Sequence, residues 1–140
     1  MVSIKQTTIY PDVIKELNYS FGDVFIFDGY VVSEIKQGVH FSWKHHAKQI
    51  VKDISCFLGT DGSDLIYISN RINPYSVVAI DWLKFFKKQY FLKCYYIVND
   101  NKISLMNVMI EELFFKNKIK NFDSIYSAIN WTKKGGEIVA

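Results

Sequence analysis

Three histidines, His40, His45 and His46, are the side chains best suited to metal binding or general acid–base chemistry. His45 and His46 are adjacent on a predicted helix, so their side chains point about 100° apart and cannot chelate one ion from a single face. A carboxylate one turn further on would supply a second ligand, but Gln49 and Ile50 occupy those positions. The spacing predicts a solvated polar face and no metal site. We expect His40, in the turn before the helix, to hydrogen-bond nearby backbone.

Covalent catalysis needs a nucleophile held in a defined turn, and the sequence has no such motif. It contains neither a Gly-x-Ser-x-Gly elbow nor a glycine-rich loop of the kind that cradles phosphates. Cys56 and Cys94 lie in apolar contexts, without the spacing of a metal knuckle or a redox pair, which predicts buried free thiols in a reducing cytosol. We therefore expect a non-enzymatic protein without a cofactor.

Serine hydroxyls offer a regulatory chemistry, reversible phosphorylation. The candidates are Ser69, Ser76 and Ser104. Each also has a structural interpretation, since Ser69 ends a predicted strand and the other two are placed to cap helices, a role worth about 1 kcal/mol. The structural roles are the simpler interpretation, and phosphorylation of Ser69 or Ser76 is the regulatory one.

The stretch from Asp64 to Ser76 is the clearest indication of a binding surface. An apolar strand pattern runs there into a polar turn with a proline, and an amphipathic helix follows. Ligands and partners of open α/β sheets usually bind at the carboxyl ends of strands. Arg71 could attract an anion at this edge, or pair with Asp64 or Asp81. The residues expected to contact a partner are Ser69, Asn70, Arg71, Asn73, Tyr75 and Ser76.

Aromatic residues make up a high share of the chain, 16%. On the helix predicted after Pro74, one apolar stripe consists of Ala79, Leu83, Phe86 and Tyr90. Trp82 and Phe85 adjoin it, and the resulting arc is wider than a surface helix needs. It predicts bulky core, a homodimer contact or the wall of an apolar ligand cavity. In the last case the ligand-contacting residues are Trp82, Phe85 and Phe86.

Strands and helices that position these side chains alternate along the chain. Strands are predicted over 13–19, 24–27, 30–35, 65–69, 92–98 and 118–122, with turns at Phe21-Gly22-Asp23 and Asp28-Gly29. Helices are predicted from Ser42 to Gly59, from Asn73-Pro74 or Ser76 to Tyr90, from Ser104 to Phe115 and from Asp123 through Trp131. This order implies an α/β fold with a mixed, mostly parallel sheet, an N-terminal antiparallel hairpin and about four helices. The single domain spans 13–133, between an N-terminal segment 1–12 and a tail 134–140.

Composition and charge limit the possible functions. The chain has 140 residues, 49% of them hydrophobic, and a net charge of +3, which is too weakly basic for a nucleic-acid-binding surface. Between Lys84 and Lys120, however, the sequence contains eight lysines and only three acidic residues, Asp100, Glu111 and Glu112. They are interpreted as solvated helix ends, or as a surface for weak contact with anionic lipid or an acidic partner. No leader and no apolar run long enough for a transmembrane segment is evident, so a cytoplasmic protein is expected.

The order of elements over residues 13–133 resembles that of STAS-like domains of the anti-sigma-factor-antagonist type, whose chain topology is shared by the lipid-binding Sec14-type (CRAL-TRIO) domains. The similar segments are Gly38-Val-His-Phe before the first helix, Ile66-Tyr-Ile-Ser-Asn in the central strand, and Phe122-Asp-Ser-Ile-Tyr-Ser-Ala-Ile-Asn-Trp at the end. The chain looks most like a bacterial branch of small STAS-like proteins.

The resemblance implies a non-enzymatic module that docks a protein partner through the loop after the central strand and the helix that follows. In that family this loop carries an Asp-Ser-Ser/Thr-Gly motif with a phosphorylated serine. Here the corresponding stretch is Ser69-Asn70-Arg71-Ile72, which keeps a serine but lacks the aspartate and glycine. A negative charge at Ser69 or Ser76 would break the partner contact. The alternative is a small apolar molecule or lipid bound between the aromatic helix and the sheet.

Overall fold

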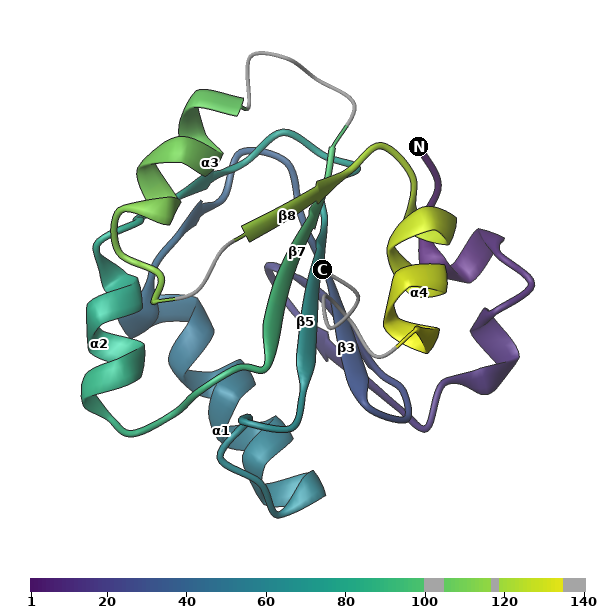
Figure 1. Cartoon of the computed structure of the whole chain (residues 1–140), viewed down its shortest axis with the longest axis horizontal. Helices are drawn as coiled ribbons and strands as arrows, with labels where there is room; N and C mark the ends of the chain where they lie inside the picture. The colour runs from purple at the N-terminus through teal and green to yellow at the C-terminus, as the bar shows by residue number, and fades with distance from the viewer. Residues whose placement is uncertain (100–104, 117–118, 135–140) are drawn as a thin grey trace.

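A six-stranded sheet forms the centre of the protein, with its strands in the order β1-β2-β3-β5-β7-β8 (Figure 1). The computed structural model describes residues 1–99, 105–116 and 119–134. The strands are β1 Lys15–Tyr19, β2 Gly22–Ile26, β3 Tyr30–Ile35, β5 Ile66–Asn70, β7 Cys94–Val98 and β8 Ile119–Phe122. The first three pair antiparallel, and β3, β5, β7 and β8 pair parallel. The predicted α/β fold class, mostly parallel with an antiparallel N-terminal hairpin, is confirmed.

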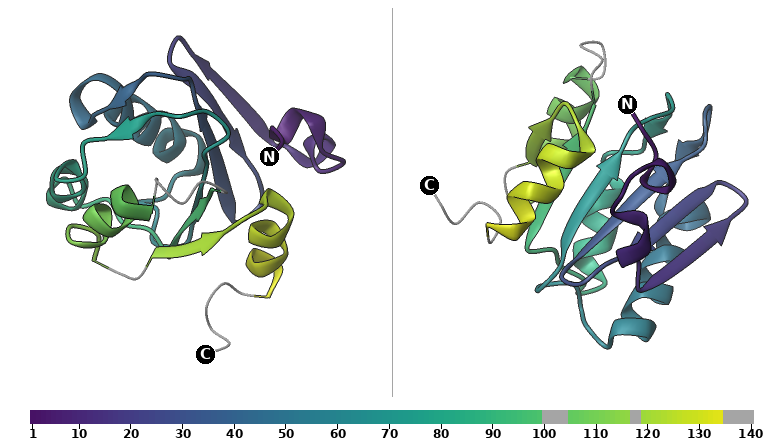
Figure 2. Two further views of the ribbon diagram at one scale, coloured as in Figure 1. Left: turned by 90° about the horizontal axis from the view of Figure 1, so that it is seen from above. Right: turned by 90° about the vertical axis from the view of Figure 1, so that its right-hand side faces the viewer.

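Helices cover both faces of this sheet (Figures 1 and 2). The π-helical turn η3 Trp43–Ala47 leads into α1 Lys48–Leu58, and α2 Asp81–Lys87 and α3 Leu105–Glu112 follow in the later crossovers. Right-handed crossovers that step across the sheet in one direction place all three helices on one face, here called the α1–α3 face. The opposite or α4 face is covered by α4 Ile125–Lys133 and the N-terminal 3-10 turns η1 Ile4–Gln6 and η2 Tyr10–Asp12.

Alternation along the strands distributes side chains between the two faces. Tyr67 of β5 and Tyr95 of β7 belong to the core of the α1–α3 face, whereas Ile68 and Tyr96, one residue on, belong to the core of the α4 face. Every residue of β7 is buried. Such continuous burial is typical of a parallel strand covered on both sides.

The N-terminal segment 1–12, expected to lie outside the domain, packs onto the α4 face. Ile4 is fully buried in that core. The buried Glu34 of β3 anchors the segment, because its carboxylate accepts hydrogen bonds from the Ser3 hydroxyl (2.6 Å) and the Ile4 backbone amide (2.7 Å). The Asn70 side-chain amide donates to the same carboxylate (3.0 Å).

Several predicted boundaries move by a few residues. β2 begins at Gly22, so the hairpin turn is the pair Ser20-Phe21 and not Phe21-Gly22-Asp23. Ser124, not Asp123, caps α4, because its hydroxyl accepts from the Ser127 amide. Cys94 is buried as expected, but Cys56 is exposed on α1. Ser104, Lys118 and the tail residues 135–140 lie outside the described residues.

The second helix begins later than predicted. Residues Ser76–Val77 form strand β6, which pairs with β4 His40–Phe41 in a separate two-stranded sheet. The Ser76 amide donates to the Val39 carbonyl (3.0 Å), so the backbone is extended there, as the adjacent Val77 and Val78 favour. Ser76 therefore caps no helix, and α2 starts at Asp81.

The inner face of α2 also differs from the predicted stripe. Leu83 is 50% exposed, whereas Phe85 is 6% exposed and Trp82 points toward the sheet. The apolar arc on this helix is so wide that the sequence alone does not show which of its residues face the sheet. Contacts with α3 and the segment after it decide which side faces inward, since the Trp82 indole donates to Glu111 of α3 (3.0 Å) and its ring packs on Phe115, beyond the helix end, with centroids 4.8 Å apart.

The start of the first helix was located correctly at Ser42, whose hydroxyl accepts from the His45 amide, and the helix ends at Gly59 in the left-handed conformation. His46 packs edge-on against Phe21 and stacks on Phe41. Its Nδ1 accepts a hydrogen bond from the Ser42 backbone amide (3.0 Å). Burial, followed by the neighbouring His45 and His40, lowers the pKa of His46 below its usual value.

This geometry predicts a loss of stability in mild acid. The pKa of His46 is lower in the folded state than in the unfolded state, where it is about 6.5. The contribution of His46 to the free energy of unfolding is therefore complete above about pH 6.5 and decreases as the pH falls below that value. The urea concentration at half unfolding should decrease between about pH 7 and pH 5 in the native protein. We expect this decrease to be smaller in His46→Asn, which keeps a hydrogen-bond acceptor but does not titrate. The exposed His45→Asn is the control and retains most of the decrease, because burial, and not the neighbouring His45, is the largest cause of the lowered pKa of His46. Equal slopes in all three proteins would contradict this role of His46.

Candidate functional site

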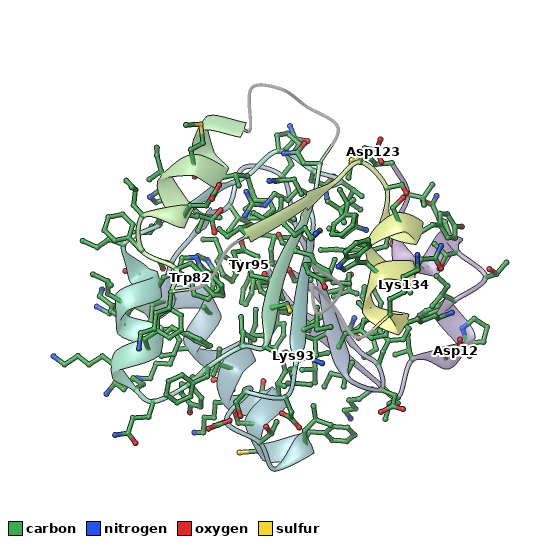
Figure 3. All side chains as sticks on the ribbon, viewed as in Figure 1. Asp12, Trp82, Lys93, Tyr95, Asp123 and Lys134 are labelled. Carbon is green, nitrogen blue, oxygen red and sulfur yellow. The ribbon has the colours of Figure 1, made fainter. Side chains whose placement is uncertain are left out.

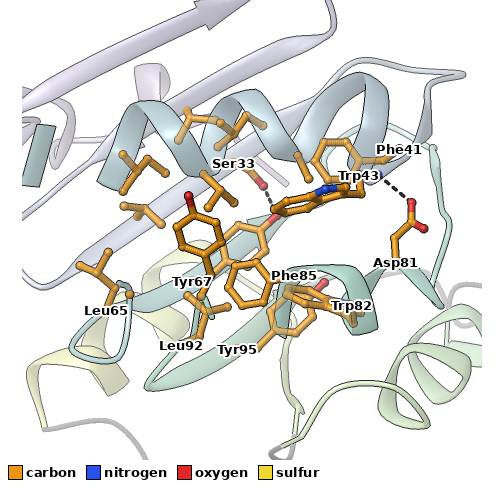
Figure 4. Close-up of a pocket in the computed structure, with 18 of the residues that line it drawn as sticks. Ser33, Phe41, Trp43, Leu65, Tyr67, Asp81, Trp82, Phe85, Leu92 and Tyr95 are labelled. Carbon is orange, nitrogen blue, oxygen red and sulfur yellow. Dashed lines mark hydrogen bonds between the residues drawn. The ribbon is translucent and has the colours of Figure 1, made fainter. Parts of the chain in front are cut away.

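A cavity of about 120 Å³ lies between the α1–α3 face of the sheet and the helices that cover it (Figure 4). Its wall is formed mainly by apolar and aromatic side chains of the sheet, η3, α1 and α2. They are Val24, Val31, Leu65, Tyr67 and Tyr95 from the sheet side, Trp43, Ala47, Ile50, Val51 and Ile54 from η3 and α1, and Trp82 and Phe85 from α2. Phe41, Tyr75, Val77, Val78, Tyr90, Phe91 and Leu92 complete the apolar wall.

Stacked aromatic rings form the sheet side of the cavity. Tyr67 and Tyr95 are register partners on adjacent parallel strands, and their rings stack at 5.1 Å with planes 11° apart. Trp82 extends this surface, with its ring 5.0 Å from that of Tyr95 (Figure 3). Trp43 enters from η3, and a π-helical turn of this kind is often found at functional sites.

Two hydroxyl groups meet in the cavity wall. Ser33 Oγ and Tyr67 Oη lie 2.7 Å apart, and both residues line the cavity. Ser33 is 2% exposed. Burial raises the pKa of the Tyr67 phenol well above its usual value, so the group is neutral at physiological pH. The pair therefore offers neutral hydrogen-bonding capacity in an apolar environment.

A buried ion pair closes the end of the cavity near the carboxyl ends of the strands. Arg71 Nη2 lies 2.6 Å from Glu111 Oε2, and both side chains are almost completely buried. Arg71 also donates to Tyr95 Oη (2.9 Å) and Ser69 Oγ (3.1 Å). The other oxygen of Glu111 accepts from Tyr95 Oη (2.8 Å) and Trp82 Nε1 (3.0 Å).

The partner of Arg71 is therefore Glu111, and not Asp64 or Asp81 as considered from the sequence. Burial by itself disfavours the guanidinium, but the facing oxygens of Tyr95, Tyr75 and Glu111 keep the pKa of Arg71 well above its usual value. Asp81 instead accepts from the Trp43 amide (2.7 Å) and pairs with the exposed Lys84 (3.2 Å). Asp81 thereby ties the start of α2 to η3.

The six residues expected to contact a partner divide into an inner and an outer group. Ser69, Asn70 and Arg71 are buried, with hydrogen bonds inside the domain. Asn73 and Tyr75 are partly exposed, and Tyr75 donates to or accepts from Ser69 at 2.7 Å. Ser76 is exposed, and its hydroxyl lies 2.6 Å from His40 Nδ1. His40 thus binds a side chain and not the backbone expected from the sequence.

The predicted apolar-ligand residues lie on or beside the cavity. Trp82 and Phe85 line it. Phe86 packs against Phe115 (5.6 Å) and is not part of the wall. Sequence reasoning missed Trp43, Tyr67, Tyr95 and Ser33. The alternation in the two strands indicates which residues share a face, but only the pairing register shows that Tyr67 and Tyr95 stack.

Comparison with known proteins supplies no relative, since no family model, no curated protein and no solved structure matches the chain. In the part of the chain that the structure describes, no helix has the length and apolar character needed to cross a membrane. Within the same ranges, no group of three or more His, Cys, Asp or Glu side chains is arranged to hold a metal ion.

The Arg71–Glu111 pair generates a stability prediction. Arg71→Met leaves the Glu111 carboxylate buried without its cation, and we expect the free energy of unfolding to fall by about 3–5 kcal/mol. Replacing both, in Arg71→Met with Glu111→Leu, removes the uncompensated charge and recovers most of that loss. Lys84→Met, which breaks an exposed ion pair, is the control and costs about 0–1 kcal/mol. Urea unfolding measures all three, and a cost below about 1 kcal/mol for Arg71→Met would contradict this assignment.

Proposed function

We propose that the protein binds a small, mostly apolar molecule in the cavity between the sheet and helices α1 and α2. The observation that carries this proposal is the cavity of about 120 Å³ with its largely apolar and aromatic wall. Small-molecule sites are typically concave, mainly apolar and supplied with a few placed polar groups. The Ser33–Tyr67 hydroxyl pair and the Glu111 network are such groups.

The size of the cavity limits the ligand. Dry apolar cavities of about 150 Å³ bind benzene, whereas sites for drug-sized ligands have about 300–1,000 Å³. A molecule with one ring fits the observed volume of about 120 Å³. A long acyl chain would require α1 or α2 to move.

The cavity also has an energetic cost that a ligand would offset. Protein interiors are close-packed, and apolar space that no atoms fill lacks packing contacts for the side chains around it, so an empty cavity of about 120 Å³ destabilises the folded state. A bound molecule restores the lost contacts and stabilises the folded state in proportion to its occupancy. Folding alone would be served better by larger side chains at these positions.

Toluene is a suitable first probe of this proposal. We expect toluene at about ten times its Kd to raise the melting temperature by roughly 5 °C, since such an excess stabilises the folded state by about 1.4 kcal/mol. Val51→Phe places a ring in the cavity and should abolish the shift. Cys56→Phe adds the same ring to the exposed side of α1 and should retain it. A shift of the same size in Val51→Phe, or none in the native protein, would refute binding at this site.

Native mass spectrometry of freshly purified protein tests the same proposal without a chosen ligand. A mass excess that disappears on denaturation is the expected result, and it should be smaller in Val51→Phe than in Cys56→Phe. An unchanged excess in Val51→Phe would place the molecule elsewhere.

A second candidate is a cytoplasmic, STAS-like interaction module, as the resemblance of the sequence implies. The observation that favours it is an exposed rim between β5 and α2. Ser76 is exposed and Asn73 partly exposed there. At the start of α2, Ile80 is 53% exposed and Leu83 is 50% exposed. Exposed lysines nearby, Lys84, Lys87 and Lys88, fit an acidic protein partner.

Cross-linking in cell extract tests this second candidate. We expect one protein to be recovered with the native chain, and to be lost with Ile80→Ser plus Leu83→Ser and with Ser76→Glu. The control, Ile14→Ser plus Phe57→Ser, changes apolar residues of similar exposure elsewhere and should retain it. Recovery that is equal in all variants would contradict a partner at this rim.

A further inference from the structure

We infer that the ligand of the cavity is a neutral, flat, single-ring molecule with one hydrogen-bond acceptor, and that the Ser33–Tyr67 hydroxyl pair receives this acceptor. The inference rests on the proposed function and names the chemical class of its ligand. Hydrogen-bond counting, the charges of the wall and the arrangement of the rings support it independently.

Hydrogen-bond counting leaves one donor available. Ser33 and Tyr67 each carry one O–H, and the single hydrogen bond between them, at 2.7 Å, uses only one of the two hydrogens. Within the described part of the chain, neither hydroxyl has another side-chain partner. Ser33 is buried and Tyr67 is half-buried, so a ligand acceptor next to this pair gains a hydrogen bond from a donor that no side chain of the described residues uses.

The charges of the wall oppose an anionic ligand. The described residues that line the cavity include the carboxylates Asp61, Asp81 and Glu111 but no lysine, arginine or histidine. The cation next to Glu111 is Arg71, which already donates to Glu111, Tyr95 and Ser69. A carboxylate or phosphate would lose its hydration on entry without gaining a cation. Fatty acids and other anions are therefore excluded.

A cationic group is not required either. Glu111 already accepts hydrogen bonds from Arg71, Trp82 and Tyr95. Asp81 accepts from the Trp43 amide and pairs with Lys84. The carboxylates are thus engaged within the protein, and a neutral ligand leaves their hydrogen bonds intact.

The arrangement of the rings favours a flat molecule. Tyr67 and Tyr95 present nearly parallel planes, 11° apart, on the sheet side. Trp43 from η3 and Trp82 from α2 both project into the same space (Figure 4). Flat rings stack offset or meet edge-to-face in such surroundings, with a gain beyond the area that they bury.

Three single-ring probes separate these features: toluene has no acceptor, benzonitrile has a neutral acceptor, and benzoate is an anion. Titration calorimetry at about pH 7, where benzoate is ionised, measures each affinity. We expect benzonitrile to bind about tenfold more tightly than toluene, the effect of one well-placed hydrogen bond, and benzoate not to bind detectably.

The hydroxyl pair is tested by Tyr67→Phe and Ser33→Ala, singly and together. Each single change leaves one hydroxyl, whose hydrogen is still available to a ligand, so the single variants should keep much of the preference. The double variant should bind benzonitrile no better than it binds toluene. Thermal unfolding confirms that each variant is folded. If the double variant is unstable, the native protein still tests the inference through its relative affinities for benzonitrile, toluene and benzoate.

The outcomes distinguish the inference from the proposed function. If toluene does not bind the native protein, the proposed function fails and this inference fails with it. If toluene binds but benzoate binds as well as benzonitrile, or the double variant keeps the preference for benzonitrile, the cavity binds ligands but the assigned ligand class is wrong.

Discussion

The buried ion pair between Arg71 and Glu111 is the interaction on which the cavity side of the protein depends. It joins the segment after β5 to α3, and through the Glu111 carboxylate it also binds Tyr95 of β7 and Trp82 of α2. A buried charge without its partner costs several kcal/mol, so these four elements are stable only when assembled together. At this end of the cavity, hydrogen bonds to Glu111 position the Tyr95 hydroxyl and the Trp82 indole N–H.

The two faces of the sheet differ in how the covering elements pack against them. On the α4 face, the N-terminal turns and α4 fill the space with fully buried residues such as Ile4 and Ala128, and Glu34 anchors the chain end. On the α1–α3 face, large aromatic rings surround a cavity that they do not fill. Since both faces draw on the same strands, the difference lies in the covering helices, and the cavity on the α1–α3 face is the reason for proposing the ligand site there.

The aromatic surplus of the sequence has a structural explanation in this difference. Tyr67, Trp82, Phe85, Tyr95 and Phe115 pack ring against ring and form one continuous group beside the cavity. Rings of this size pack edge-to-face or stacked on one another, and each pair adds to the stability gained from the area that it buries. The same rings bring hydroxyl and indole groups, which need hydrogen-bond partners when buried, and Glu111 and Ser33 provide them.

The sequence by itself determined the α/β class, the six strands of the main sheet to within a few residues and both ends of the first helix, because apolar periodicity and caps such as Ser42 and Gly59 are local signals. It also indicated Trp82 and Phe85 as cavity residues, from an apolar arc that was too wide. Only the tertiary structure decided that Arg71 points inward to Glu111, 40 residues away, that Ser76 lies in a strand, and that Tyr67 meets Ser33. Contacts of this kind depend on strand register and on the face chosen by each crossover, and no stretch of local sequence encodes either.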